Sequence, residues 1–532
     1  MPEMIKTDIK LPINYTESDL YDAVEAKLPV DRSEIRDYRF EKRTLSISDK
    51  SDIHYDTVIS LSFSDEREAG LLKMRKKVSK SPDYTLNIPK SRMTSRPVVI
   101  GAGPAGLMCA LILAEAGANP ILYERGLAVE ERDKKIKAFN TLGILDTECN
   151  VQYGEGGAGT YSDGKLKVGA KDKYKYKVLA EFVEHGAPED IIYSVGAHVG
   201  TDKLSHIVRG IRNKIIALGG EVNFSSKLSD LKIKDGKVKG GTVLVDGEKR
   251  IDFETDTVVL ATGHSAKDSF ELLRDLGIGL VARGFGIGAR IEHPREYINE
   301  IMYGKNPPES IGAASYHLVT HLQNGRSVYS FCMCPGGSVV AAASEHGGIV
   351  TNGMSEYARD GINSNAAFLV SVTPSDFMSD DPLAGLDLQR SIERRAFALA
   401  GSDYKAPTQR MEDFLSGRKS SSAAAICPTY PRGTVLARTE EYLPEFITDS
   451  LRAAIPDFNE WMRGFYYPDA PMTGPETRTT SPVRVLRDEK SFETLAVRGI
   501  YPIGEGAGYA GGIISSARDG VMAAEAILKN CK

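Results

Sequence analysis

The stretch PVVIGAGPAGLMCALILAEAGANPILYER, residues Pro97–Arg125, predicts a single βαβ unit. Val98–Ile100 is a wholly apolar run, as a parallel strand that is buried on both faces requires. A G-x-G-x-x-G then opens a helix with apolar residues at helical spacing, and Ile121–Tyr123 forms the second strand. Because the glycines stand between a strand and a helix, the stretch predicts a dinucleotide-binding turn.

Each residue type in this turn has a physical role. Gly101 permits the tight turn, Gly103 lets a pyrophosphate approach the backbone, and Gly106 lets the helix pack against the sheet. The helix N-terminus, which begins at Pro104 and Ala105, offers unpaired N–H groups to an anion. Glu124 ends the second strand, where a carboxylate accepts a hydrogen bond from an adenosine ribose. Arg125 is a further candidate contact, although it does not by itself indicate a 2′-phosphate. These residues are the predicted binding set: Gly101, Gly103, Pro104, Ala105, Gly106, Glu124 and Arg125.

Length and composition limit the function classes. A chain of 532 residues predicts two or three domains, and 41% hydrophobic with 26% charged residues is typical of a soluble globular protein. A net charge of −5 argues against non-specific nucleic-acid binding by the whole chain. The six cysteines are sparse and no signal peptide precedes them, which indicates a reducing cytoplasm. No apolar run is long enough to span a membrane.

Four regions follow from the order of the patterns. Residues 1–92 predict a small α/β domain, with the ferredoxin-like arrangement as the candidate, and the strands expected there include 35–41 and 43–47 as separate elements. The basic run Lys73–Lys80 indicates either an RNA- or phosphate-binding patch or a solvated linker, and the linker is favoured. Residues 97–282 and 481–532 predict the dinucleotide-binding fold, and 283–480 predicts an inserted, mostly antiparallel sheet with helices.

Three further glycine-marked segments are expected to meet the same ligand. The loop Tyr153–Lys165 is too rich in glycine for a regular helix or strand, and its candidate contacts are Gly157, Thr160, Ser162, Gly164 and Lys165. A buried strand, Thr257–Ala261, should join the parallel sheet and end in a turn of Ala261, Thr262 and Gly263. Near the C-terminus, a strand runs into Gly504, Glu505 and Gly506, and Gly511, Gly512 and Ile513 begin the last helix.

Taken together, these segments resemble the glutathione-reductase-type flavoprotein superfamily. Within it, the chain is similar to bacterial FAD-dependent dehydrogenases through Gly156–Leu166, Phe331–Ala343 and Glu476–Arg484. The resemblance implies an α/β architecture: a Rossmann-like FAD-binding domain, an inserted mixed α+β substrate domain and a small N-terminal α/β domain. It implies FAD as cofactor, with Glu505 at the position of an acid that bonds the ribityl chain. Backbone N–H groups around Gly511–Ile514 would face the flavin pyrimidine edge.

The electron donor and the reactive side chains are less defined. No second G-x-G-x-x-G follows a strand, so NAD(P)H is expected only as a transient donor. Cys332 and Cys334 could form a redox couple, but their spacing in a strand favours packing. His317 and His321 share a face of a predicted strand without a third ligand, so no metal site is predicted. Arg478 and Arg484 are candidates to steer an anionic substrate over the flavin ring. The alternative is that they only pair with carboxylates, as arginines near domain junctions often do.

The sequence therefore predicts a cytoplasmic FAD-dependent oxidoreductase that transfers hydride to or from flavin N5 and acts on a small molecule. Two alternatives stay open. One is a flavin-dependent NAD(P)H monooxygenase. The other is an RNA-associated flavoprotein that uses residues 1–92, which the acidic net charge disfavours. Neither the substrate, the general acid or base, nor the oligomeric state follows from the sequence.

Overall fold

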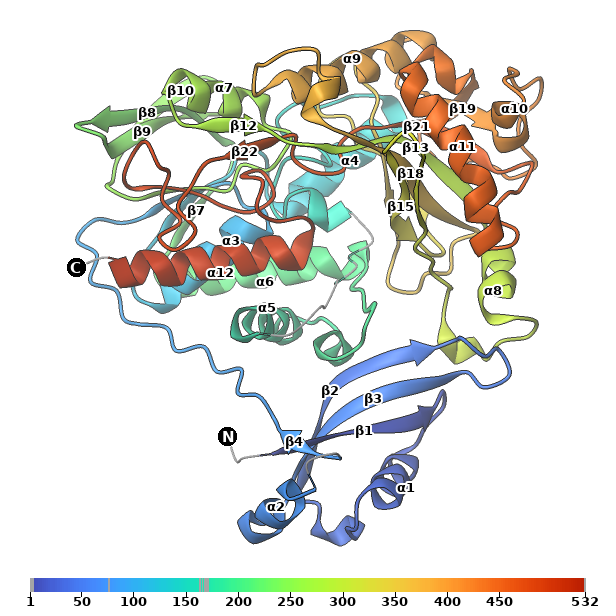
Figure 1. Cartoon of the computed structure of the whole chain (residues 1–532). Helices are drawn as coiled ribbons and strands as arrows, with labels where there is room; N and C mark the ends of the chain where they lie inside the picture. The colour runs from blue at the N-terminus through green and yellow to red at the C-terminus, as the bar shows by residue number, and fades with distance from the viewer. Residues whose placement is uncertain (1–3, 75–76, 162–163, 165, 167–171, 531–532) are drawn as a thin grey trace.

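A computed structural model describes residues 4–74, 77–161, 164, 166 and 172–530. It has a small N-terminal part and a larger part, joined by the extended segment 81–97 (Figure 1). The first strand of the larger part is β5 (Val98–Ile100). None of the helices formed by the described residues is both long and apolar enough to cross a lipid bilayer.

The N-terminal part is a four-stranded antiparallel sheet with two helices, in the strand order β2-β3-β1-β4. Its chain order, βαββαβ, is that of the ferredoxin-like motif. The elements are β1 (Ile5–Pro12), α1 (Glu17–Lys27), β2 (Asp37–Ser46), β3 (His54–Ser62), α2 (Asp65–Leu72) and β4 (Ser79–Lys80). The two strands expected at 35–41 and 43–47 form the single strand β2, because a β-bulge at Glu41 absorbs the break in alternation without ending the pairing with β3.

The larger part contains a five-stranded parallel sheet in the order β23-β11-β5-β6-β7. Its strands are β5, β6 (Ile121–Tyr123), β7 (Glu221–Asn223), β11 (Val258–Leu260) and β23 (Ile500–Pro502). The expectation that the strand predicted at Thr257–Ala261 joins the parallel sheet is confirmed, since β11 pairs with β5 in parallel. The central strands β5 and β11 are wholly apolar and buried because both faces of the sheet are covered there, whereas the edge strand β7 carries the exposed Glu221.

One face of this sheet packs on helices and the other on a small sheet. Val99 belongs to the core formed with four helices, whereas Val98 and Ile100 belong to the core on the opposite face. The helices are α3 (Pro104–Glu115), α5 (Lys173–Glu184), α6 (Thr201–Ala217) and α12 (Ile513–Asn530). The opposite face carries β8 (Ser226–Lys234), β9 (Lys237–Val245), β10 (Lys249–Glu254) and α7 (Lys267–Asp275).

The region between residues 283 and 480 forms a seven-stranded sheet in the order β14-β15-β18-β13-β21-β19-β20. The expected antiparallel sheet is confirmed, with one parallel pair, β19 and β20, at its edge. Its strands are β13 (Phe285–Pro294), β14 (Val319–His321), β15 (Ser327–Cys334), β18 (Asn363–Val372), β19 (Ala406–Arg410), β20 (Thr434–Leu436) and β21 (Pro471–Glu476). Helix α11 (Glu445–Trp461) packs on one face of this sheet, which leaves the other face toward the parallel sheet (Figure 1).

The remaining elements connect or flank these layers. They are α4 (Val129–Leu142), α8 (Arg295–Tyr303), α9 (Ala384–Leu399), α10 (Met411–Leu415), and the strand pairs β12 (Leu280–Ala282) with β22 (Val483–Val485) and β16 (Ser338–Ala341) with β17 (Thr351–Met354). Six short 3₁₀ turns lie among the described residues, at Arg32–Glu34, Ala158–Tyr161, Glu189–Ile192, Glu309–Ile311, Pro374–Asp376 and Thr439–Glu441. The N-terminal part rests on the larger part through β2, where Arg43 forms a parallel bridge with Ser194.

Candidate functional site

A cavity of about 910 Å³ lies between the parallel sheet and the seven-stranded sheet. The carboxyl ends of β5, β6, β11 and β23 open into it, together with the N-termini of α3 and α12 and parts of β15, β17 and β21. In open α/β sheets, ligands bind outside the carboxyl ends of the strands. The size is that of a site for a large cofactor or a cofactor with a substrate.

The glycine turns that the sequence predicted to converge do so around this cavity. A Cβ atom on Gly101 would stand 2.3 Å from the carbonyl oxygen of Ala261, and one on Gly506 would stand 2.4 Å from that of Gly263. A Cβ on Gly504 would lie 2.7 Å from the Cβ of Ala105. The turns after β5, β11 and β23 therefore pack backbone against backbone, which only glycine permits.

Gly103 and Gly106 occupy different environments within one turn. A Cβ on Gly106 would stand 1.9 Å from the carbonyl oxygen of Gly101, so this glycine serves helix packing. A Cβ on Gly103 would meet no described atom nearer than Gly157 Cα, at 3.9 Å. Gly103 is also the N-cap of α3 and provides no side-chain cap, so the first amides of the helix face open space. This cradle, which a side chain at Gly103 would fill, suits a pyrophosphate.

Glu124 is buried and holds three backbone amides. Its Oε2 accepts a hydrogen bond from Ala102 N at 2.7 Å, and its Oε1 accepts from Gly126 N at 2.9 Å and Gly154 N at 3.0 Å. The carboxylate thus ties the first glycine turn to the glycine-rich loop, a role that its strand-end position did not reveal. Arg125 stacks on the ring of Tyr153 at 4.5 Å and forms an ion pair with Asp268.

Most of the predicted binding residues line the cavity. They are Gly101, Gly103, Pro104, Ala105, Glu124, Arg125, Gly157, Gly164, Ala261, Thr262, Gly263, Gly504, Glu505, Gly506, Gly511, Gly512 and Ile513. Two of the predicted residues do not contribute to the lining. Thr160 is buried, with its Oγ1 beside the position that a Cβ on Gly156 would take, and Gly106 packs inside the fold. The predicted contacts Ser162 and Lys165 lie outside the described residues.

The glycines that precede α12 and the first residues of this helix also line the cavity. The Gly512 N–H donates to Glu505 Oε2 at 3.3 Å, and the Gly511 N–H donates to Ser515 Oγ at 3.0 Å. Both predicted glycine amides are therefore engaged within the chain. The amides that remain without an intrahelical partner start at Ile513, where the helix begins.

Glu505 is a titratable carboxyl group inside the cavity. Burial raises its pKa to about 7, against the lowering effect of the Gly512 N–H. Because the folded protein holds this proton more tightly than the unfolded chain, the associated stability is complete below about pH 4 and is lost as the pH rises to about 7.

We expect the Glu505→Gln variant, in flavin-free protein, to gain stability relative to the parent as the pH rises from about 4 to about 7. The difference should grow by at most about 1.4 kcal/mol per pH unit and then level off. Urea unfolding of both proteins at several pH values measures it. A difference that is constant over this range would show that the Glu505 pKa is the same in the folded and unfolded states.

The prediction that Arg478 and Arg484 steer an anionic substrate does not agree with their environments. Arg478 lines the cavity, but its Nε and Nη2 donate to both oxygens of Glu393 at 2.9 and 2.7 Å, and its Nη1 donates to Ser344. Arg484 lies outside the lining; its Nε donates to the Gly508 carbonyl at 3.2 Å. The charge of Arg478 is thus neutralised within the protein, and Arg484 forms a hydrogen bond with the loop that follows β23.

His264 is a cavity residue that the sequence reasoning missed. The Gln152 NH₂ group donates to Ala342 O at 3.4 Å, which fixes the orientation of this amide. Its Oε1 therefore accepts the hydroxyl proton of Ser265, at 3.2 Å. The Ser265 Oγ has no second proton, so it accepts from His264 Nδ1 at 3.3 Å. This assigns the proton to Nδ1 and leaves Nε2 as an acceptor. Burial, aided by the charge of Arg478, lowers the His264 pKa to about 4, so the ring is neutral at neutral pH. Its position directly after Ala261-Thr262-Gly263 was the available signal.

The cysteine and histidine pairs that the sequence raised as candidate centres lie in different environments. Cys332 and Cys334 are not joined in a disulfide; Cys332 lines the cavity, and Cys334 is buried. His317 precedes β14 and lies at the cavity, whereas His321 shares a hydrogen bond with Ser327 Oγ at 2.9 Å.

Among the described residues, one group of three possible metal ligands lies close together, Glu181, Glu184 and His185. Lys214 Nζ donates to both carboxylates of this group, at 2.8 and 2.9 Å. An ammonium group therefore already occupies the position in which the carboxylates could share a cation.

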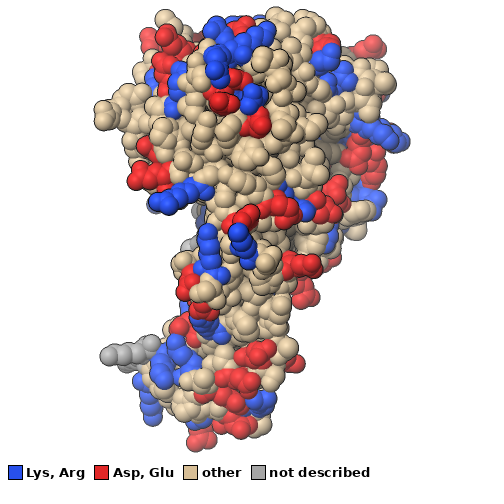
Figure 2. Space-filling model, turned by 90° about the vertical axis from the view of Figure 1, so that its right-hand side faces the viewer, with Lys and Arg blue, Asp and Glu red and all other residues tan. Residues whose placement is uncertain are grey.

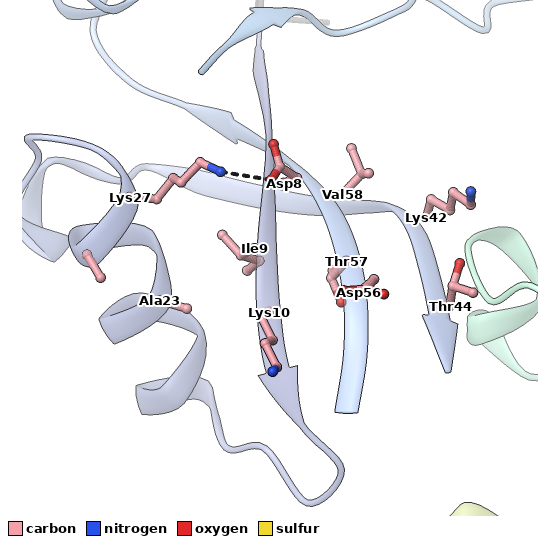
Figure 3. Close-up of a pocket in the computed structure, with 11 residues that line it drawn as sticks. Asp8, Ile9, Lys10, Ala23, Lys27, Lys42, Thr44, Asp56, Thr57 and Val58 are labelled. Atoms are coloured by element: carbon pink, nitrogen blue, oxygen red, sulfur yellow. Dashed lines mark hydrogen bonds and ion pairs between the residues drawn. The ribbon is translucent and has the colours of Figure 1, made fainter. Parts of the chain in front are cut away.

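A second hollow, of about 590 Å³, lies in the N-terminal part beside α1 (Figure 3). Lys27 extends from α1 to Asp8 on β1, where their ion pair measures 2.8 Å. Lys10 pairs with Asp52 at 2.7 Å.

Comparison with known proteins shows which family the chain belongs to. Residues 284–479 match the model of a family described as "FAD-dependent protein, C-terminal domain-like". A protein of Clostridium beijerinckii, described as an uncharacterized protein, is 47% identical over 437 residues, which cover 82% of this chain and 81% of that protein. The chain belongs to the family of this protein. In this chain, the residues matched by the FAD-dependent-protein model lie between β11 and β23 of the parallel sheet.

Solved structures show a remote likeness. A flavoprotein/dehydrogenase from Cytophaga hutchinsonii has a TM-score of 0.36 at 11% identity and covers 82% of this chain and 80% of that one. A 3-ketosteroid-Δ4-(5α)-dehydrogenase from Rhodococcus jostii has a TM-score of 0.35 at 13% identity, with 84% and 99% covered. The quinol fumarate reductase of E. coli has a TM-score of 0.35 at 14% identity, with 82% and 69% covered. At these scores the likeness carries no inference about chemistry.

Proposed function

We propose that the protein is an FAD-dependent oxidoreductase with a Rossmann-like, glutathione-reductase-type cofactor site. The observation that carries the proposal is the cradle at Gly103, which is open to a ligand although the neighbouring glycines are packed backbone against backbone. It lies at the N-terminus of α3, where a pyrophosphate is favoured by free amides and the helix dipole. The match of residues 284–479 to FAD-dependent proteins supports the same cofactor.

In this proposal the residues of the chain bind FAD and orient it. The turns at Gly101–Gly106 and Gly504–Gly506 would grip the pyrophosphate and ribityl parts, and the carboxylate of Glu124 keeps the adenosine end in place through Ala102 and Gly154. The first amides of α12 would face the pyrimidine edge, where they stabilise negative charge. When bound, FAD would supply the hydride chemistry at N5. NAD(P)H is proposed only as a transient donor.

The test begins with the visible spectrum and flavin content of the purified protein, followed by anaerobic reduction with NADH and NADPH. A yellow protein with one flavin per chain is the expected result. A colourless protein that takes up no FAD after reconstitution would contradict the proposal. Reduction by one nicotinamide would identify the donor.

We expect Gly103→Ser to weaken FAD binding at least tenfold and to leave the flavin-free fold intact. Gly103 has φ −72° and is an N-cap, a position that serine favours, so the backbone is not strained. The new Cβ would instead occupy the space proposed for the pyrophosphate. Fluorescence titration with FAD measures the affinity, and urea unfolding checks the fold. An unchanged FAD affinity would place the cofactor elsewhere.

The two alternative functions have less support. A monooxygenase would couple NADPH consumption to insertion of oxygen, which product analysis under air would detect. An RNA-associated role needs a basic surface, but residues 1–92 contain 17 Lys and Arg against 17 Asp and Glu. On the face shown in Figure 2, basic and acidic side chains are interspersed.

A further inference from the structure

We propose that the substrate end of the cavity binds an uncharged ring compound that carries a hydrogen-bond acceptor such as a carbonyl. We define the substrate end as Tyr329, Phe331, Asn352, Glu476, Arg478 and Thr479, which line the cavity from the seven-stranded sheet and its neighbours. This inference rests on the proposed function, because it concerns the molecule that meets the flavin.

Two aromatic rings form one wall of the substrate end. Tyr329 and Phe331 are two residues apart on β15 and so project from the same face of the sheet, with ring centroids 6.4 Å apart in an edge-to-face arrangement. The ring of Tyr329 extends across β18 to Gly286 on β13, where a Cβ would stand 2.3 Å from the tyrosine hydroxyl. The glycine thus makes room for the ring. A flat apolar molecule would pack well on this surface.

The arginines at this end are neutralised inside the protein. Arg290, on β13, is fully buried and donates to both carboxylate oxygens of Glu476, at 2.5 and 2.7 Å. Its remaining N–H groups donate to Cys332 O at 2.8 Å and to the side-chain oxygens of Asn352 and Asn365, each at 3.0 Å.

Arg478 is engaged in the same manner with Glu393 and Ser344. Within the described part of the chain, an anionic group bound at this end would have to displace one of these buried carboxylates from its arginine. Buried ion pairs of this geometry are costly to separate, so carboxylates and phosphates are disfavoured.

Two neutral donors at the substrate end, the NH₂ group of Asn352 and the hydroxyl of Tyr329, have no hydrogen-bond partner among the described residues. Arg290 can only donate, so the atom of Asn352 that faces it is the oxygen, and the NH₂ group of Asn352 points elsewhere. The Asn352 oxygen also accepts from Gly353 N at 2.8 Å, which holds the amide in this orientation. Burial raises the pKa of Tyr329 to about 12, so its hydroxyl stays protonated and can donate. These donors match a carbonyl or similar acceptor.

The experiment compares benzamide with benzoate on the flavin-containing protein. The two probes have nearly the same shape, and only benzoate carries a charge. Binding is followed by the difference spectrum of the flavin and by calorimetry. We expect benzamide to bind at least tenfold more tightly than benzoate. Equal or tighter binding of benzoate would overturn the proposal, and so would failure of both probes to bind up to their solubility limits.

The Tyr329→Phe variant removes one proposed donor and keeps the ring. It should weaken benzamide binding several-fold without changing flavin content, whereas Tyr357→Phe, at a partly exposed tyrosine outside the cavity lining, should change neither. Unchanged benzamide affinity in Tyr329→Phe would refute the role of its hydroxyl and with it the proposed binding mode. A protein without flavin would instead contradict the proposed function, and calorimetry with both probes on that protein would still decide the preference for charge.

Discussion

Replacing Gly106 by alanine is expected to lower the free energy of unfolding by about 3 kcal/mol or more, at the upper end of the cost of overpacking a core. The added Cβ would stand 1.9 Å from the carbonyl oxygen of Gly101 and 3.2 Å from the Cβ of Ala261. The nearest atom is backbone and lies in the turn between β5 and α3, so no side-chain rotation relieves the clash. Helix α3 would have to move away from the parallel sheet.

Urea unfolding followed by circular dichroism measures this effect, with Gly103→Ser as the matched control three residues earlier in the same turn. The control should unfold within about 0.5 kcal/mol of the parent, because a Cβ at Gly103 meets no described atom closer than 3.9 Å. The two variants distinguish helix packing from cofactor binding. Gly106→Ala is expected to lower the free energy of unfolding, and Gly103→Ser is expected to lower the affinity for FAD. If Gly106→Ala were as stable as the parent, the close packing of α3 on the turn would be wrong.

Replacing Glu476 by glutamine is expected to cost about 3–5 kcal/mol, the usual penalty for leaving one partner of a buried ion pair. Arg290 has no exposed surface. Burial lowers its pKa, but Glu476, together with Cys334 and Cys332, more than offsets this and keeps the Arg290 pKa above its ordinary value, so the charge persists. Glutamine keeps the shape but removes the negative charge. The guanidinium would then be buried without a counter-charge, beside the strand β15 whose Cys332 carbonyl it binds.

The double variant Arg290→Met with Glu476→Leu should recover most of the lost stability, because it removes both charges from the core. Glu296→Gln is the surface control: Glu296 pairs with Arg295 but its side chain is 74% exposed, so the change should be below about 1 kcal/mol. Chemical unfolding of all four proteins makes the comparison. The interpretation fails if Glu476→Gln is no less stable than Glu296→Gln.

Secondary structure was predictable where it depends on residues close in the sequence. The apolar run Val98–Ile100 and the glycine turn predicted β5 and α3. The division of β2 into two strands was wrong because the bulge at Glu41 is stabilised by pairing with β3, which the alternation of the single strand does not contain.

The sequence predicted where the glycines of the candidate site meet, but it did not predict which charged residues there are paired. Glycine positions report local steric limits, so the convergence of Gly101, Gly263 and Gly506 followed from their place at strand ends. Whether Arg478 meets an anion or pairs with a carboxylate of the chain stayed open in the sequence, because its partner Glu393 is 85 residues away. His264 was missed although it directly follows Ala261-Thr262-Gly263, because its neighbours in sequence do not show that burial and Arg478 lower its pKa.

The amino-acid order alone determined the βαβ unit, the parallel strand that joins it, the antiparallel character of 283–480 and the glycine turns, since each of these arises from periodicity or from backbone sterics within a short window. Only the tertiary structure decided which charged groups are available to a ligand. Arg290 and Glu476 are 186 residues apart and meet between β13 and β21, and burial then makes the attraction of Arg290 to Glu476 stronger than its attraction to a solvated anion. The chemistry of the substrate end therefore depends on pairings that the linear sequence does not display.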